Sequence, residues 1–457
     1  MKRTTAKILA GILAAASAAS FASCADSSSG GAETTTTTEK TEWTGDNIEI
    51  TIDEDAIDDT IDIHGKSLKY LGFVDPNPTN DSNERSAALA LFEDTYGAKI
   101  EFIYTTNPER FDALANLISS GNSPDIFSYE WRTFPNDISQ GRYQSVDSLI
   151  DWSDPMWADV KDAADLFMWN GEHYIAPFGY DFDNTQVLMY NKTTVEEEGL
   201  DDPYELYLEG KWDWNVFVDM MKTYVEQGDD RYGICGWWEN AFVYTAGDTI
   251  ISYDGKTFKN NLYSAKIERA QNVMRDIYVN DLYKCDDWYQ GDKVFKERPP
   301  LFYAMGTWAY NDVAKSCGDD ILQIVPFPRD PEQDTDFFST SISSYMWVIG
   351  SDNADCVKAW LNVNRLVNYD PQYTDVVKEK YLKNHPYWTS EMYDVTMNFF
   401  DPKKFTFSFD HGFGFGPDMD KIMEHLYYDV AKGKSESWVQ LREEHKNEVD
   451  SQIAKYN

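Results

Sequence analysis

Residues 68–74 have the sequence LKYLGFV, an apolar run that predicts a buried β-strand. Residues 84–96 carry apolar side chains on one stripe and predict a helix, and residues 99–104 predict the next strand. A second helix over residues 108–120 and a third strand over residues 125–129 continue the alternation. Strands that alternate with amphipathic helices are typical of βαβ units with a parallel sheet, so this stretch decides an α/β fold class.

The same alternation continues along the chain, and no internal repeat of solenoid period occurs. Further strands are predicted over residues 174–178, 186–190, 301–305, 321–325 and 345–349. Further helices are predicted over residues 213–226, 265–280, 354–367, 420–432 and 436–456. The chain has 457 residues. A single hydrophobic core stops growing near ~250–300 residues, so we expect two or more lobes.

The charge balance excludes some classes of partner. The chain has 40 Lys and Arg residues against 79 Asp and Glu residues, which gives a formal net charge of −39. A nucleic-acid binder needs an excess of cationic side chains to replace counterions, so we expect no nucleic-acid partner. Binding to anionic lipid through a basic face is disfavoured for the same reason.

The sequence contains no recognised motif for catalysis, a cofactor or a metal. HExxH, GxSxG, GxxxxGK(S/T) and a helix-opening GxGxxG are all missing, and no Cys pair has CxxC spacing. Asp75, Asn77, Thr79 and Asp81 alternate like calcium ligands, but the Gly and Glu of a calcium loop are missing. We expect no cofactor and no metal, while one or two disulfides remain open.

The first 23 residues have the features of a secretory signal peptide, because a basic segment precedes a short apolar run over residues 8–22. The small residues before Cys24 resemble a bacterial lipobox, which implies that Cys24 is lipidated and becomes the mature N-terminus. The alternative is an ordinary signal peptide cleaved nearby. Residues 24–65 are polar and acidic and predict a flexible tether. We therefore expect a lipid anchor on the extracellular face of the cell membrane.

Five short sequences follow one another in a specific order: LISSGNSPDI (117–126), NGEHYIAP (170–177), LMYNK (188–192), GTW (306–308) and PFP (326–328). Together they resemble the sugar-binding, maltose-binding-protein-like family of extracellular solute-binding lipoproteins, which serve bacterial ABC sugar importers. The resemblance covers residues 66–457. It implies a two-lobed α/β fold of the periplasmic-binding-protein type II with crossover hinge strands. It also implies a monomer that delivers an oligosaccharide to the permease subunits of an ABC transporter by lobe closure.

The resemblance further implies how the chain divides. The two lobes are expected over residues 66–180 with 344–400 and over residues 181–343 with 401–457. The crossovers are expected near residues 178–180 and near Ser343 and Ser344. Gly179 suits a hinge, because hinge residues must absorb changes in φ and ψ.

Sugars present flat apolar faces and rings of hydroxyl groups, so a sugar site needs aromatic platforms beside polar side chains. Pockets in open α/β sheets lie beyond the carboxyl ends of the strands. The candidate ligand-binding residues come from three sources. These are the loops at such positions, the crossover, and the aromatic positions that the resemblance implies. The candidates are Asn80, Asp81, Glu130, Trp131, Tyr180, Asp181, Trp237, Trp238, Glu239, Trp308, Tyr345, Phe413 and Phe415.

The expected ligand is a neutral oligosaccharide that stacks on Trp237 or Trp238 and on Trp308. Glu239 and Asp181 are expected to accept hydrogen bonds from its hydroxyl groups. The net charge of −39 repels anionic ligands such as uronic acids, unless Arg110 or Arg132 offsets the field locally.

Two other functions remain open on the sequence alone. Glu130, Asp181 and Glu239 could supply the two carboxylates of an extracellular glycoside hydrolase or lyase. A surface adhesin would instead hold polysaccharide without transporting it. The lack of a catalytic motif disfavours the enzyme, and the two-lobed pattern disfavours a lectin, which is usually all-β. We therefore expect a binding protein and no enzyme.

Overall fold

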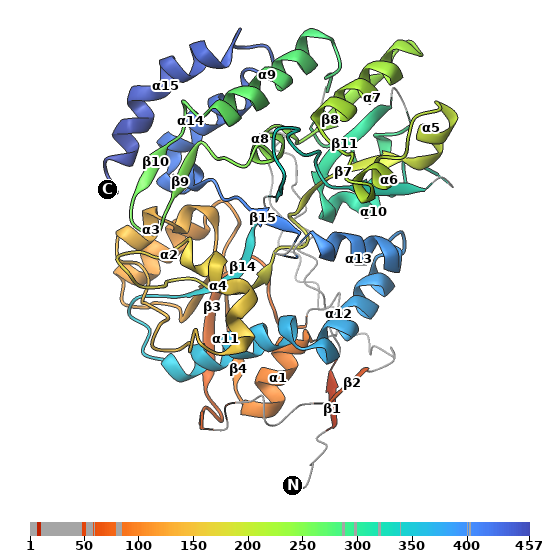
Figure 1. Ribbon diagram of the computed structural model, residues 1–457. Helices are drawn as coiled ribbons and strands as arrows, with labels where there is room; N and C mark the ends of the chain where they lie inside the picture. The colour runs from red at the N-terminus through yellow and green to blue at the C-terminus, as the bar shows by residue number, and fades with distance from the viewer. Residues whose placement is uncertain are drawn as a thin grey trace, which may run out of the picture. The chain divides into compact units, whose positions relative to one another are not determined.

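The computed structural model describes most of the chain (Figure 1). The described residues are 58, 60–78, 85–285, 288–296, 299–318, 321–338, 340–399, 401 and 404–457, with the backbone of residues 7–10 and 48–51. Cys24, Asn80 and Asp81, which the sequence singles out, lie outside the described residues.

The chain forms two compact units. Unit 1 consists of Met1–Phe127 and Gly350–Tyr381, and unit 2 consists of Ser128–Ile349 and Leu382–Asn457. These boundaries differ from the predicted lobe boundaries, because residues 128–180, 344–349 and 382–400 fall in unit 2. The division into lobes therefore stays a prediction.

Unit 1 contains the βαβ sequence that the first apolar run predicts. Its elements are β1 (Lys7–Ala10), β2 (Ile48–Thr51), β3 (Ser67–Gly72), α1 (Ala87–Tyr96), β4 (Lys99–Tyr104), α2 (Arg110–Ser119), most of β5 (Ile126–Ser128), α11 (Ala354–Tyr369) and most of α12 (Pro371–Asn384). β3 pairs in parallel with β4 on one side and with β5 on the other, which confirms the predicted parallel arrangement here. β1 and β2 form a separate antiparallel pair.

Asp125, just before β5, connects this small sheet to the start of α11. Its carboxylate accepts hydrogen bonds from the backbone N–H of Lys69 (2.8 Å), the hydroxyl of Ser351 (2.6 Å) and the side-chain amide of Asn353 (2.9 Å). The start of α11 is thereby tied to β3. Further along, Trp360 of α11 packs edge-on against Phe92 of α1, with ring centroids 5.3 Å apart.

Unit 2 has more elements, in two groups. Its strands are β6 (Ala176–Tyr180), β7 (Gln186–Asn191), β8 (Tyr232–Gly236), β9 (Ile251–Tyr253), β10 (Phe258–Asn260), β11 (Pro300–Gly306), β12 (Leu322–Val325), β13 (Asp336–Phe338), β14 (Ile342–Trp347) and β15 (Phe405–Phe407). Its α-helices are α3 (Asn136–Ser139), α4 (Ala158–Asp165), α5 (Lys192–Glu197), α6 (Pro203–Leu208), α7 (Trp214–Glu226), α8 (Glu239–Tyr244), α9 (Ala265–Val279), α10 (Tyr310–Ala314), α13 (Ser390–Asn398), α14 (Pro417–Tyr428) and α15 (Trp438–Ile453). Short 3-10 helices include η2 (Trp131–Thr133), η5 (Thr307–Ala309) and η6 (His411–Phe415).

The main sheet of unit 2 has the strand order β12-β7-β11-β8. β8 and β11 are parallel, whereas β7 runs antiparallel to both β11 and β12, so this sheet is mixed. Every residue of β7, β8 and β11 is buried, as expected for strands covered on both faces. α7 packs on β8 and shields that end of the sheet (Figure 1).

A second ladder joins the two segments that the sequence predicts as crossovers. β6 and β14 are antiparallel, and Gly179 lies opposite Ser343. The register shifts between Ser343 and Ser344, which marks a bulge at this position. The predicted crossover residues are therefore register partners in one ribbon.

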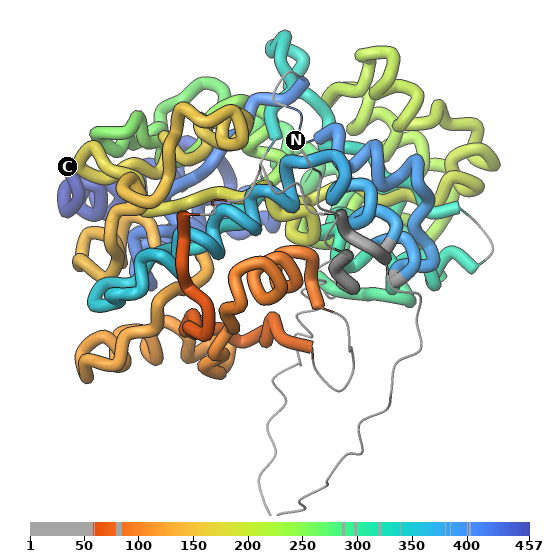
Figure 2. The backbone as a smooth tube through the Cα atoms, turned by 90° about the horizontal axis from the view of Figure 1, so that it is seen from below, coloured from red at the N-terminus to blue at the C-terminus, as the bar shows by residue number. Residues whose placement is uncertain are grey.

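α15 packs against both α9 and α14, and the three helices lie together at the left of Figures 1 and 2. The side-chain amide of Gln271 on α9 donates to the carbonyl of Leu426 on α14 at 2.9 Å. Arg442 on α15 forms an ion pair with Glu268 on α9 at 2.6 Å. These buried and half-buried polar contacts fix the register of the three helices.

Asp410 connects three elements of unit 2. Its carboxylate accepts hydrogen bonds from the backbone N–H groups of Ile250 (2.8 Å), Ile251 (3.2 Å) and Gly412 (2.9 Å), and from the Tyr427 hydroxyl. Burial raises its pKa to about 6 even though these donors oppose the shift. The start of β9, η6 and α14 therefore meet at one carboxylate.

We expect Asp410→Asn to lower the free energy of unfolding by about 2–4 kcal/mol. An amide has one accepting oxygen, so buried N–H groups lose their acceptor and remain unpaired. Urea denaturation measures the loss, and Asp276→Asn, at an exposed position of α9, is the matched control. A loss equal to that of the control would show that Asp410 does not hold these elements together.

Candidate functional site

The candidate site lies at the carboxyl ends of β8 and β11. The two strands are parallel and Ala304 is the register partner of Gly236, so both strands end at the same edge of the sheet. Trp237 directly follows β8, and Trp308 follows β11 on η5. The two Trp residues that the sequence predicts as platforms therefore emerge from neighbouring strands.

Gly236 makes this close approach of the two strands possible. Its φ is +97°, and an added Cβ would lie 2.1 Å from the carbonyl oxygen of Ala304. The backbone N–H of Trp237 donates to that same carbonyl at 2.8 Å. Only glycine permits this turn, and the turn sets the direction in which Trp237 leaves the sheet.

Of the two adjacent Trp residues, only Trp237 presents a surface. Its side chain is 37% exposed, and its Nε1 donates to the Tyr428 hydroxyl at 3.1 Å. Trp238 is 0% exposed and packs against Phe242 and Tyr283. The prediction of Trp238 as a stacking platform is therefore corrected, because its ring faces are occupied by protein.

Three consecutive residues after Trp237 contain buried polar atoms. Trp238 Nε1 and Asn240 Oδ1 have no hydrogen-bond partner among the described residues, and the contact of Glu239 Oε1 is its ion pair with Lys432. Native proteins pair almost all such atoms, so a cluster of exceptions requires an explanation. Hydroxyl groups both donate and accept hydrogen bonds, so they match the chemistry of all three atoms.

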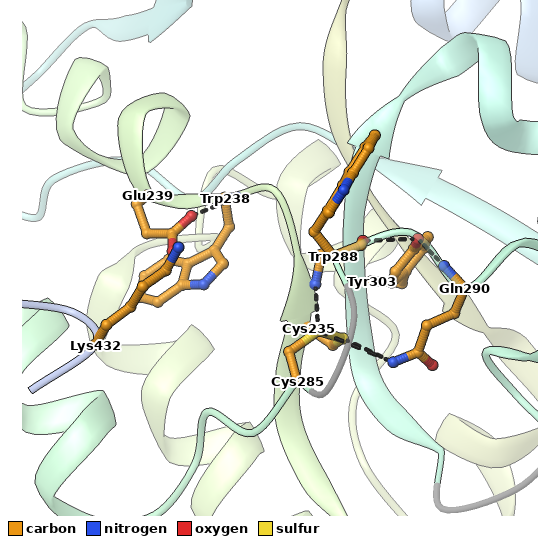
Figure 3. The surroundings of a disulfide bond; sticks show 9 residues. Cys235, Trp238, Glu239, Cys285, Trp288, Gln290, Tyr303 and Lys432 are labelled. Carbon is orange, nitrogen blue, oxygen red and sulfur yellow. Dashed lines mark hydrogen bonds and ion pairs between the residues drawn. A yellow bond between two sulfur atoms is a disulfide. The ribbon is translucent and has the colours of Figure 1, made fainter. Parts of the chain in front are cut away.

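Glu239 is a buried carboxylate held beside a cation. Its Oε2 accepts the backbone N–H of Trp238 at 3.2 Å, and its Oε1 lies 3.5 Å from Lys432 Nζ (Figure 3). Burial raises the pKa of Glu239, and Lys432 opposes that shift. Lys432 also lies over the Tyr428 ring at 4.4 Å. Lys432 therefore contacts Glu239 and Tyr428, and Tyr428 in turn bonds to Trp237.

Trp308 is half-buried and belongs to a further aromatic pair. Its ring lies 5.3 Å from the ring of Tyr289, whose hydroxyl donates to Asp312 at 3.0 Å. Trp288, next to Tyr289, is 49% exposed. The sequence analysis missed Trp288 and Tyr289, although two adjacent aromatic residues beside acidic residues repeat the signal that singled out residues 237–239.

The crossover candidates pair with other aromatic rings. Tyr180 stacks on Phe407 at 4.3 Å, and Tyr345 stacks on Phe178 at 5.3 Å. The Asp181 carboxylate accepts from the backbone N–H (3.1 Å) and the side-chain amide (2.7 Å) of Asn184. These residues are half-buried, and part of their bonding capacity serves the β6–β14 ribbon and its turn.

The two Phe candidates of η6 have different environments. Phe415 is 5% exposed and packs edge-on against Phe258 and Tyr456, with centroids 4.9 and 4.7 Å away. Phe415 is therefore a core residue, which corrects its prediction as a ligand contact. Phe413 is half-buried and stacks on Tyr427.

Glu130 and Trp131 lie beside Arg132, in a second cluster of charged and aromatic residues that also includes Asp420. Trp131 is 44% exposed, and the Arg132 guanidinium lies 5.9 Å from its ring centroid. Burial and the nearby Glu424 raise the pKa of Asp420 to about 7, and the opposing cation is Arg132. This group thus combines an aromatic surface with both signs of charge.

The described part of the chain has neither a membrane-spanning helix nor a metal-binding cluster. No helix there is both long and apolar enough to cross a membrane. No group of three or more His, Cys, Asp or Glu side chains there is arranged to hold a metal ion.

The sequence matches the family described as "Bacterial extracellular solute-binding protein" over residues 87–378. The chain belongs to this family, whose members bind solutes and are not enzymes. A curated relative, the maltotriose-binding protein of Pyrococcus abyssi, is 22% identical over 305 residues. That match spans 63% of this chain and 63% of the relative, so it covers less than two thirds of either protein.

Solved structures agree on the fold. The sugar-binding protein MalE from Xanthomonas citri superposes with a TM-score of 0.61 at 14% identity, covering 85% of this chain and 98% of MalE. The cyclic alpha-maltosyl-1,6-maltose binding protein from Arthrobacter globiformis gives a TM-score of 0.61 at 15% identity, with coverages of 85% and 98%. The GacH receptor of Streptomyces glaucescens gives 0.59 at 15% identity, with coverages of 86% and 99%. These matches confirm the predicted α/β fold class of two-lobed periplasmic binding proteins.

We expect Asp420→Asn to flatten the dependence of stability on pH. With a folded pKa of about 7, the folded state binds this proton more tightly than the unfolded state does. The free energy of unfolding therefore falls as the pH rises from about 4 to about 7. The loss should be roughly 1–2 kcal/mol, because solvent screens a half-exposed group.

Urea denaturation at a series of pH values measures this effect. The matched control is Asp219→Asn, at an exposed position of α7, which should keep the pH slope of the wild type. An identical slope in Asp420→Asn and the wild type would show that Asp420 titrates normally.

Proposed function

We propose that this chain binds a neutral oligosaccharide and delivers it to the permease of an ABC transporter. The observation that carries this proposal is the exposed indole of Trp237 beside three buried polar atoms, two of which have no hydrogen-bond partner among the described residues while Glu239 Oε1 is ion-paired with Lys432. A pyranose ring offers an apolar face for the indole and hydroxyl groups for the polar atoms. Few other soluble ligands combine these two features.

Each of the three polar atoms has a role in this proposal. Glu239 Oε1 and Asn240 Oδ1 would accept hydrogen bonds, and Trp238 Nε1 would donate one. A sugar hydroxyl serves either role, so a single ring can meet both kinds of demand. A carboxylate acceptor also makes the bond stronger than a neutral acceptor would.

Similar proteins support the ligand class. The maltotriose-binding protein and the cyclic alpha-maltosyl-1,6-maltose binding protein are similar to this chain, and the GacH structures include a complex with acarbose. All of these are oligosaccharides or their analogues. We further propose that the chain acts as a monomer and that its two predicted lobes close on the ligand. Closure would pair contacts from both lobes and make affinity depend on a hinge equilibrium.

Trp237→Ala should weaken oligosaccharide binding by about 1–3 kcal/mol, because it removes an aromatic anchor. Trp308→Ala should have a similar effect. Calorimetric titration with maltotriose and a panel of neutral and uronic-acid oligosaccharides measures both. Small-angle scattering of the ligand-saturated protein should show a smaller radius of gyration than that of the free protein. Incubation with the oligosaccharides should form no cleaved product.

The matched control is Tyr263→Ala, which removes an exposed aromatic ring that contacts Arg442 and Glu443 of α15. Its affinity should equal that of the wild type. A wild-type chain that binds only uronic-acid oligosaccharides would contradict the neutral ligand, and a chain that cleaves them would contradict the binding function.

We also propose that the mature protein is anchored through a lipid on Cys24, which lies outside the described residues. Mass spectrometry of protein purified from membranes should find a diacylated Cys24 at the N-terminus. Cys24→Ser should release the protein into the medium, because the anchor is lost. An unmodified N-terminus at any other residue would rule out the lipid anchor.

A further inference from the structure

We propose that the Cys235–Cys285 disulfide is a positioning device for the ligand platform. It holds the segment carrying Trp288 and Tyr289 so that Tyr289 packs on Trp308. This inference rests on the proposed function, since it concerns the same binding site. It assigns Cys285 and Tyr289 as positioning residues.

The segment is attached to β8 on its N-terminal side. The carbonyl of Leu282 accepts the backbone N–H groups of Gly233 (2.8 Å) and Ile234 (3.1 Å), and Tyr283 forms a β-bridge with Ile234. Cys285 is then joined covalently to Cys235, the next-to-last residue of β8. Because Cys235 is 1% exposed, the bridge lies against the interior of the sheet.

The segment is attached to β11 on its C-terminal side. The hydroxyl of Tyr303 donates to the carbonyl of Trp288 at 3.1 Å and accepts the backbone N–H of Gln290 at 3.1 Å (Figure 3). The side-chain amide of Gln290 lies 3.4 Å from the sulfur of Cys235. One buried hydroxyl and one disulfide therefore hold the two residues that flank Tyr289.

Tyr289 is the residue through which the attached segment contacts the candidate site. Its ring lies against that of Trp308, and its hydroxyl donates to Asp312 just beyond η5. On the β8 side, the disulfide adjoins Gly236, whose N–H lies 3.3 Å from the sulfur of Cys285, and Trp237 follows at once. The bridge thus touches the supports of both Trp platforms.

Without the disulfide, only hydrogen bonds would hold the segment at β8. The chain on either side of Cys285 would gain conformational freedom, and ordering it again on ligand binding would cost affinity. A disulfide that merely stabilised the fold would lower the melting temperature without changing affinity. The two roles therefore make different predictions.

The test compares oxidised wild type with the double variant Cys235→Ala/Cys285→Ala, using maltotriose as the probe. We expect the double variant to remain folded, to melt at a lower temperature and to bind about tenfold more weakly. Arg442→Met is the matched control, because it breaks the ion pair between α15 and α9, destabilises unit 2 away from this segment and should keep wild-type affinity. An unchanged Kd in the double variant overturns the inference.

Coupling between residues provides a second criterion. Tyr289→Ala should weaken binding in the wild type but add little in the double variant, because both changes act through the same contact. Fully additive effects would show that the disulfide does not act through Tyr289 and would overturn the inference.

Hydrogen exchange provides a readout that needs no ligand. Peptides that cover residues 288–296 and 303–312 should exchange faster in the double variant than in the wild type. Unchanged exchange overturns the positioning role even if the wild type binds maltotriose. If the wild type binds no oligosaccharide, the proposed function fails, while the exchange rates still decide whether the bridge positions this segment.

Discussion

The candidate site depends on β11, which is buried along its whole length and paired on both sides. Its parallel partner β8 must end at the same edge, and Gly236 allows the two backbones to approach closely there. Trp237 and Trp308 therefore leave the sheet from the ends of two paired strands. A site built on such strands is held more precisely than one built on a free loop.

The buried polar atoms at this edge of the sheet lower the free energy of unfolding. An unpaired buried donor or acceptor costs about 1–3 kcal/mol, and a folded domain is stable by only about 5–15 kcal/mol. Trp238 Nε1 and Asn240 Oδ1 would use part of that margin, whereas Glu239 Oε1 keeps its ion pair with Lys432. Unpaired buried polar atoms are expected where function requires them. The cluster is therefore stronger evidence for a binding site than any single exposed aromatic ring.

Much of the fold could be predicted from the sequence, because apolar periodicity is local. The β3–α1–β4–α2–β5 alternation and the strands β7, β11 and β12 all follow from short apolar runs. The mixed direction of the main sheet could not be predicted, since strand direction depends on pairing between distant segments. α12 and α13 were also missed, and both lie in a stretch rich in polar and aromatic residues.

The candidate site was predictable in composition but not in detail. The sequence GWWEN singled out this turn as a candidate, yet it could not tell exposed Trp237 from buried Trp238, because the turn at Gly236 decides which ring points inward. Phe415 was misjudged for the same reason, since its partners Phe258 and Tyr456 are distant in sequence. Trp288 and Tyr289 join the site through a disulfide of sequence separation 50, which a pattern of scattered Cys residues does not reveal.

Glu239 connects the charge of the whole chain with recognition at one site. Burial favours its neutral form, and Lys432 favours the carboxylate. A sugar hydroxyl that donates to this oxygen would stabilise the carboxylate without bringing another charge into the interior. An anionic ligand would instead meet both this carboxylate and the field of a chain with net charge −39. The local site and the overall charge therefore favour a neutral ligand for independent reasons.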